Sequence, residues 1–120
     1  MCLRRATNDD WIVLTKLHPP ALWYGFVAET SFMMLGIGGA FYAEEGRWWA
    51  TFKRLPGVRH TLTAHKAAKL TLAVAGDLGV ALHAVADEEI WGSAAWLGRL
   101  GFRETGETYL DRTVWTWARN

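Results

Sequence analysis

The chain has 120 residues, of which 51% are hydrophobic and 21% charged, and its formal net charge is +1. This length and composition predict one globular domain, residues 1–120, and exclude a disordered chain. The near-neutral charge argues against a nucleic-acid partner, and no apolar run is long enough to cross a membrane, so we expect neither kind of partner.

The chain begins with a predicted strand at residues 3–6 and a short helix. Thr7 or Asn8 can cap this helix, and acidic residues follow in its first turn, where the helix dipole favours them. One face of the helix is apolar, formed by Trp11, Leu14 and Leu17. We expect Pro19 and Pro20 to end it, because proline cannot continue a helix.

Three antiparallel strands are predicted next, at residues 22–29, 32–42 and 47–55, with turn residues between them. The second strand contains Gly36, Gly38 and Gly39. Glycine inside a strand marks a bulge, a bend or the close approach of another chain, so a structural bend and a ligand contact are both open here. In the third strand, alternation places Trp49 and Thr51 on one face and Trp48, Ala50 and Phe52 on the other.

The longest helix is predicted from Thr61 or Thr63 to about Ala75. Its buried stripe is expected at helical spacing, formed by Leu62, Ala67, Leu70 and Val74, with Lys66 and Lys69 on the solvated side. An apolar strand at residues 80–86 suits a central position in a sheet. A short helix up to Leu100 and a closing hairpin within residues 103–119 complete the chain.

The segment 94–102, A-A-W-L-G-R-L-G-F, resembles the last helix of a GCN5-related N-acetyltransferase (GNAT) domain as it enters its closing hairpin. The order of the predicted elements is similar to the GNAT order along nearly the whole chain. The resemblance implies an α/β fold with a mixed, mostly antiparallel central sheet flanked by helices. The pair Trp96 and Leu97 also resembles the GNAT-like proteins of bacteriophages, including the small internal virion protein family of short-tailed phages.

The resemblance implies a site for acetyl-CoA at the start of the long helix. There a GNAT domain holds the pyrophosphate on backbone N–H groups, since a helix N-terminus is a ready anion site. The matching candidates here are Val58, Arg59, His60, Thr61 and Lys66. The spaced glycines of the family's loop are absent, so a solvated turn with a helix cap is the alternative. The acyl arm would lie between the strands that end near residues 54 and 86.

Catalytic residues are not evident at the family's usual positions. The tyrosine that often serves as general acid corresponds to Leu97, and an asparagine of the preceding strand corresponds to Ile90; neither side chain can transfer a proton. Candidate bases are His83, Asp87 and Glu88. The alternatives are a hydrogen-bonded core histidine for His83 and solvated loop acids for the other two.

These observations leave two hypotheses for the function. One is a non-catalytic GNAT-fold protein of phage or prophage origin, acting in the virion or on a host protein in the cytoplasm. The other is an acetyl-CoA-dependent N-acetyltransferase acting on an amine. Cys2 is the one cysteine and the four histidines lack paired ligand spacing, so neither a disulfide nor a metal site is expected.

A protein partner or a homodimer is a further expectation, since eight tryptophans are many for a chain of this size. Trp115 and Trp117 share one face of the closing strand. If that strand lies at the sheet edge, its unpaired backbone groups would invite pairing. The alternative is that both rings pack on a helix of the same molecule.

Overall fold

The computed structural model describes residues 2–43, 45–54, 61–85 and 93–119. Along these parts of the chain the elements follow in the order β1 (Cys2–Arg5), α1 (Asn8–Thr15), β2 (Trp23–Glu29), β3 (Met34–Tyr42), β4 (Trp48–Arg54), α2 (Thr61–Leu78), β5 (Leu82–Val85), α3 (Ser93–Leu100), β6 (Arg103–Tyr109) and β7 (Arg112–Trp117). Each element predicted from the sequence is therefore present, with ends shifted by a few residues.

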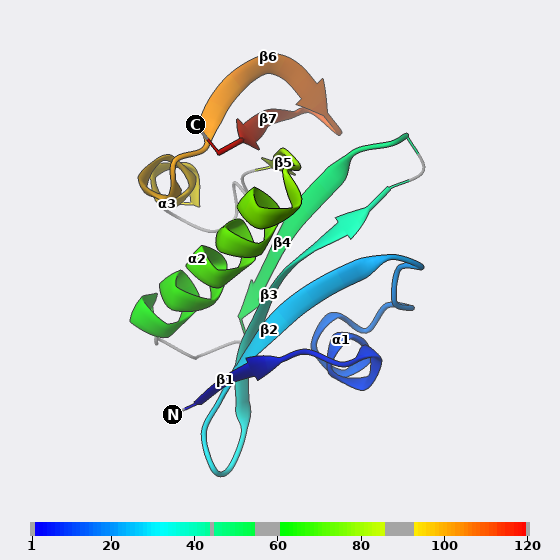
Figure 1. The fold of residues 1–120 in the computed structure, drawn as a ribbon, viewed down its shortest axis with the longest axis vertical. Helices are drawn as coiled ribbons and strands as arrows, with labels where there is room; N and C mark the ends of the chain where they lie inside the picture. The colour runs from blue at the N-terminus through cyan, green and yellow to red at the C-terminus, as the bar shows by residue number, and fades with distance from the viewer. Residues whose placement is uncertain (1, 44, 55–60, 86–92, 120) are drawn as a thin grey trace.

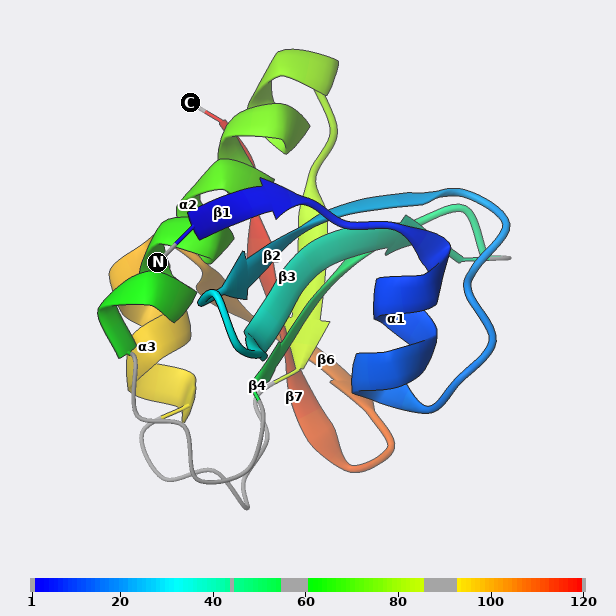
Figure 2. The same ribbon diagram turned by 90° about the horizontal axis from the view of Figure 1, so that it is seen from below.

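The seven strands form one sheet in the order β1-β2-β3-β4-β5-β7-β6. Neighbouring strands are antiparallel except β4 and β5, which run parallel. Helix α1 covers one face of the sheet, while α2 and α3 cover the other (Figures 1 and 2). This is the mixed, mostly antiparallel α/β fold that the sequence predicts. No helix of the described ranges is long and apolar enough to span a membrane.

Helix α1 begins as predicted but ends earlier. Thr7 is the N-cap, and its side chain and that of Asp10 form a reciprocal capping box. The helix ends at Thr15 because Lys16 adopts a left-handed conformation, with φ of 62°. The expectation that Pro19 and Pro20 end the helix is wrong, and Leu17, which lies beyond the last turn, is 64% exposed.

A partly buried ion-pair network joins α1 to the sheet. The guanidinium of Arg4 in β1 makes two hydrogen bonds to the carboxylate of Asp10, at 2.7 and 2.9 Å, and a third to Glu29 in β2 at 2.8 Å. The Asp10 carboxylate also accepts from the Thr7 backbone N–H at 2.8 Å. The hydrogen bonds from Arg4 outweigh the effect of burial and lower the pKa of Asp10 from 3.8 to about 2.

This pair predicts an acid-sensitive contribution to stability. Because the folded state lowers the pKa of Asp10, the contribution is present above about pH 4 and is lost as the pH falls toward 2. The shift corresponds to about 2 kcal/mol. We expect Asp10→Asn to lower the free energy of unfolding by about this amount at pH 7, in urea titrations. The difference in the free energy of unfolding between variant and wild type should shrink below pH 4. A difference that does not change with pH would contradict the assignment of the lowered pKa to Asp10.

Helix α2 packs on the sheet through small residues. Its buried side chains are Ala67, Ala68, Thr71, Leu72 and Ala75. The predicted stripe is wrong at Leu70, which is 39% exposed, because the buried face is rotated toward the alanines. The helix runs three residues past Ala75 and is followed by Gly79 with φ of 71°. As predicted, Lys66 and Lys69 are exposed.

The glycines of β3 allow the chain to approach itself. A Cβ atom at Gly38 would lie 3.1 Å from the Phe52 ring in β4 and 3.6 Å from the carbonyl carbon of Ala67 in α2. One at Gly39 would lie 2.4 Å from the carbonyl oxygen of Tyr24 in β2. Of the two alternatives left open by the sequence, these contacts favour a structural role.

The closing strand β7 lies inside the sheet, between β5 and β6. The idea of an unpaired edge at Trp115 and Trp117 is therefore wrong. Both rings are half-buried and pack against the core beneath α2 and α3, where a Cβ atom at Gly101 would lie 3.4 Å from the Trp117 ring. The alternative, packing on a helix of the same molecule, is confirmed. Whether their exposed parts bind a partner stays a prediction.

Candidate functional site

Strands β4 and β5 separate soon after they meet. They are paired at two positions, Trp48 with Leu82 and Trp49 with His83, and the following residues of each strand are not paired with the other. A cavity of about 420 Å³ lies at this split. The separation of the two strands agrees with the gap that we expected between them. The presence of an acyl arm in this gap stays a prediction.

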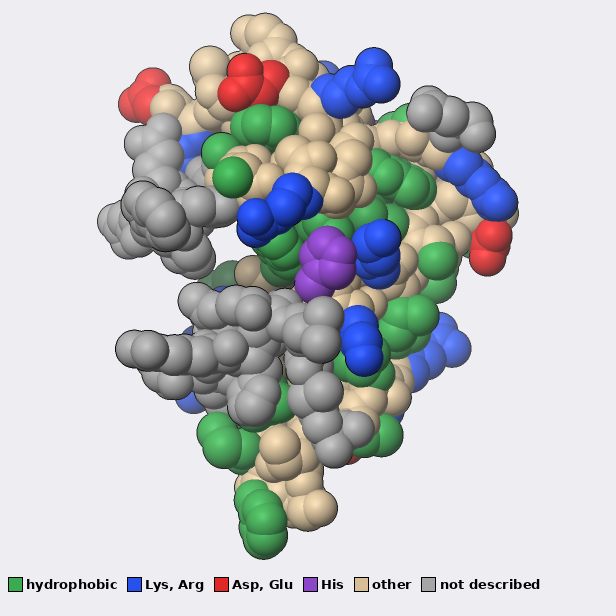
Figure 3. Space-filling view, turned by 90° about the vertical axis from the view of Figure 1, so that its left-hand side faces the viewer, with side chains coloured by type: hydrophobic (Ala, Val, Ile, Leu, Met, Phe, Trp, Pro, Cys, Tyr) green, Lys and Arg blue, Asp and Glu red, His purple; other side chains and the backbone are tan. Residues whose placement is uncertain are grey.

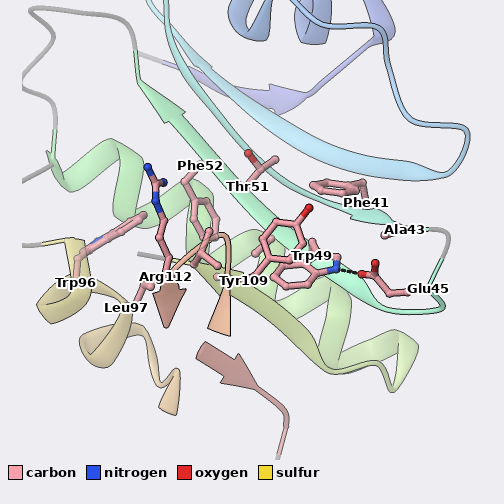
Figure 4. Close-up of a pocket in the computed structure, with 13 residues that line it drawn as sticks. Phe41, Ala43, Glu45, Trp49, Thr51, Phe52, Trp96, Leu97, Tyr109 and Arg112 are labelled. Carbon is pink, nitrogen blue, oxygen red and sulfur yellow. Dashed lines mark hydrogen bonds between the residues drawn. The ribbon is translucent and has the colours of Figure 1, made fainter. Parts of the chain in front are cut away.

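The cavity is lined differently at its two ends (Figure 4). At the split the walls are mainly apolar side chains of β4, β5 and α3, namely Ala50, Phe52, Ala84, Val85, Trp96 and Leu97. At the end formed by the β3–β4 and β6–β7 hairpins they are Phe41, Ala43, Glu45, Trp49 and Tyr109. Thr51 and Arg112 complete the lining, and the guanidinium of Arg112 lies toward Trp96, away from Glu45 (Figure 4).

Trp49 is held in place from several sides. Its indole N–H donates to the carboxylate of Glu45, in the turn between β3 and β4. Its ring lies 5.5 Å from that of Tyr109 and 5.6 Å from that of His83, between centroids. A tryptophan with so many neighbours presents a fixed aromatic surface to the cavity.

Trp96 connects the two helices beside the split. Its ring meets the ring of Phe52 edge-on, with centroids 5.2 Å apart, and its indole N–H donates to Nδ1 of His65 in α2 at 3.3 Å. The hydrogen bond requires His65 to carry no proton on Nδ1. These contacts position α3 over the cavity.

The residues predicted to bind the cofactor are only partly described. Val58, Arg59 and His60 lie outside the described residues. Thr61 is the first residue of α2, and Lys66 is exposed five positions later, about 7.5 Å along the helix axis. Figure 3 views this side of the molecule and shows Lys and Arg side chains gathered around a histidine. A positive face of this kind favours an anionic ligand.

Of the three catalytic candidates, the structure describes His83 alone. Asp87, Glu88 and Ile90 lie outside the described residues. His83 is half-buried, and its Nδ1 lies 3.3 Å from the carbonyl oxygen of Trp48, which favours the hydrogen-bonded alternative; a role as a base stays a prediction. It reaches the cavity only through its contact with Trp49. Leu97 is 3% exposed and lines the cavity without a polar atom.

Sequence reasoning missed Glu45, Tyr109 and Arg112 as cavity residues. Each lies in or beside a hairpin turn, where polar residues are common for structural reasons alone. Glu45 and Tyr109 both contact Trp49, and Tyr109 comes from the hairpin whose strand β7 pairs with β5. Within the described ranges, no group of three His, Cys, Asp or Glu side chains could hold a metal ion.

Neither a protein-family model nor a curated protein matches the sequence. Solved structures do resemble this one. A GNAT-superfamily phosphinothricin acetyltransferase from Sinorhizobium meliloti, in complex with acetyl-CoA, has a TM-score of 0.75 at 16% identity, over 98% of this chain and 87% of that one.

An acetyltransferase from Bacillus subtilis, in complex with CoA, has a TM-score of 0.71 at 10% identity, over 99% of this chain and 100% of that one. An N-acetyltransferase from Staphylococcus aureus Mu50 has a TM-score of 0.70 at 10% identity, over 97% and 96%. At these identities the likeness is one of fold. The chain therefore has the fold of the GNAT acetyltransferases.

Proposed function

We propose that the protein binds acetyl-CoA at the split between β4 and β5 and transfers the acetyl group to an amine. The observation that carries this proposal is the cavity of about 420 Å³ at the split. That volume lies within the range of small-molecule sites, about 300 to 1,000 Å³. The structural neighbours that hold acetyl-CoA and CoA support the same choice of ligand.

The residues at the split fit a narrow, flexible acyl arm. Ala50 and Ala84 leave room between the strands, while Val85, Phe52 and Leu97 supply an apolar wall. The positive face at the start of α2, which includes Lys66, would lie toward the phosphates. In the transfer, the neutral amine nitrogen bonds to the acyl carbon, the carbon–sulfur bond breaks, CoA leaves as the thiolate with the electron pair of that bond, and the proton lost by the nitrogen passes to the thiolate through water.

A second proposal is a non-catalytic role of phage or prophage origin, in a virion or on a host protein. Leu97 favours it: at the position in α3 where the resembling enzymes often carry a tyrosine, this chain has a buried leucine. Such a side chain cannot protonate a leaving thiolate. Because fold does not determine function, both proposals are compatible with the architecture.

Thermal unfolding with acetyl-CoA, followed by an assay of thiol release with a panel of amines, separates the proposals. A ligand that binds only the native state at 100 times its Kd adds about 2.7 kcal/mol. For a domain of this size we expect a rise in Tm of roughly 10 °C. ATP, which has phosphates but no acyl arm, should give a much smaller shift.

Release of CoA that depends on an amine would support the enzyme. A rise in Tm without transfer to any amine would contradict catalysis and favour the second proposal. An unchanged Tm at millimolar acetyl-CoA would contradict acetyl-CoA binding altogether.

A further inference from the structure

The hairpin end of the cavity combines aromatic rings with one carboxylate. Phe41, Trp49 and Tyr109 come from three different strands, and Glu45 from the turn between two of them (Figure 4). We propose that this end binds the acceptor and selects small amines that carry an aromatic or aliphatic body and no carboxylate. The inference rests on the proposed function and names its class of acceptor.

The aromatic surface is preformed. Trp49 and Tyr109 have their ring centroids 5.5 Å apart and their planes inclined at 44°, so two adjoining faces border the same space. Phe41 pairs with Trp49 across strands β3 and β4. Aromatic faces attract both apolar groups and organic cations, since the ring quadrupole is negative above the plane.

Glu45 supplies the charge that an ammonium group needs. Among the lining residues that the structure describes, it is the one acidic side chain. One of its oxygens, Oε1, accepts the indole N–H of Trp49, which orients the carboxylate beside the ring. An ammonium group placed here would gain a charge-assisted hydrogen bond and a cation–π contact together.

The charge distribution disfavours amino acids as acceptors. A carboxylate next to the amine nitrogen would face Glu45 and be repelled by it. Arg112, the basic residue of the described lining, directs its guanidinium toward Trp96 at the other end of the cavity (Figure 4). The geometry therefore separates the positive group from the place where the amine binds.

Three amines test the selection on the full chain. Phenethylamine has the aromatic body and no carboxylate, L-phenylalanine adds the carboxylate, and ethanolamine lacks the apolar body. We expect phenethylamine to bind about tenfold or more tightly than either of the others in calorimetric titrations, with and without acetyl-CoA. Equal affinities, or preference for L-phenylalanine, would overturn the proposal.

Glu45→Gln isolates the charge, because glutamine keeps an oxygen for the Trp49 N–H. We expect KM, or Kd, for phenethylamine to rise about tenfold while the affinity for acetyl-CoA stays unchanged. Glu107→Gln is the matched control: it removes the same charge from an exposed residue bonded to Arg47, outside the cavity. An equal effect of both variants would overturn the role of Glu45.

The two proposals fail in different ways. If acetyl-CoA binds and is consumed, but the three amines react with equal kcat/KM, the selection is wrong and the acetyltransferase stands. If phenethylamine binds in a Glu45-dependent manner but no acetyl transfer occurs, the acetyltransferase is wrong, while the amine site is supported.

Discussion

Gly39→Ala is expected to destabilise the protein by about 3 kcal/mol, the upper end of the usual cost of overpacking, since a clash with backbone atoms cannot be relieved by a side-chain rotation. A Cβ atom at this position would lie 2.4 Å from the Tyr24 carbonyl oxygen and 3.0 Å from the Gly25 Cα. Gly39 pairs with Gly25 in the register of β3 and β2, so both strands are involved. To admit one methyl group, β2 and β3 would have to move apart.

Urea titrations of the wild type and variant measure this cost. Gly106→Ala in β6 is the matched control, because a Cβ atom there meets nothing within 4 Å. We expect the control to lie within about 1 kcal/mol of the wild type. Similar stabilities for the two variants would mean that β2 and β3 are not as close as the structure shows.

Val85→Trp is expected to abolish acetyl-CoA binding while leaving the fold intact. Val85 lies at the end of β5, is half-buried and lines the cavity at the split. An indole at this position would occupy much of the space between β4 and β5. Tryptophan is also well tolerated in strands, so the cost to folding should be small. We expect the affinity for acetyl-CoA to fall by about a hundredfold or more, equivalent to about 2.7 kcal/mol.

Two melting temperatures are measured for each variant. The Tm without ligand reports folding, and the rise in Tm on adding acetyl-CoA reports binding. Val13→Trp is the control, with the same substitution on the exposed side of α1, away from the cavity. If Val85→Trp were to respond to acetyl-CoA as strongly as the wild type, the ligand would bind elsewhere.

The sequence predicted the elements well because their signals are local. Thr7 was one of two predicted caps for α1 and is the observed one, and the apolar run at residues 80–86 contained β5. The errors arose where tertiary contacts decide. Leu70 suited an apolar stripe at helical spacing, but α2 packs through alanines against the glycines of β3, which rotates the buried face. Whether β7 lies at the sheet edge was left as a condition, and it is not met, because strand order is not encoded in any single strand.

The site was predictable only where it follows from the order of elements. The split between β4 and β5 was expected from the resemblance to GNAT domains, which rests on that order. Glu45 and Tyr109 could not be assigned from the sequence, because their meeting depends on β7 lying next to β5. Their residue types are ordinary for turns, so nothing in their own neighbourhood marks them.

The brief pairing of β4 with β5 has a consequence for cooperativity. The sheet consists of two blocks, β1 to β4 and β5 to β7, and the first is made of strands that follow one another closely in the chain. Two register positions join the blocks, against seven between β3 and β4. Beyond this pairing, the blocks share a core cluster to which α2, β5 and α3 all contribute buried side chains. A molecule bound in the split would contact both blocks. Its binding free energy would therefore oppose their separation, and amide hydrogen exchange would become slower in both blocks.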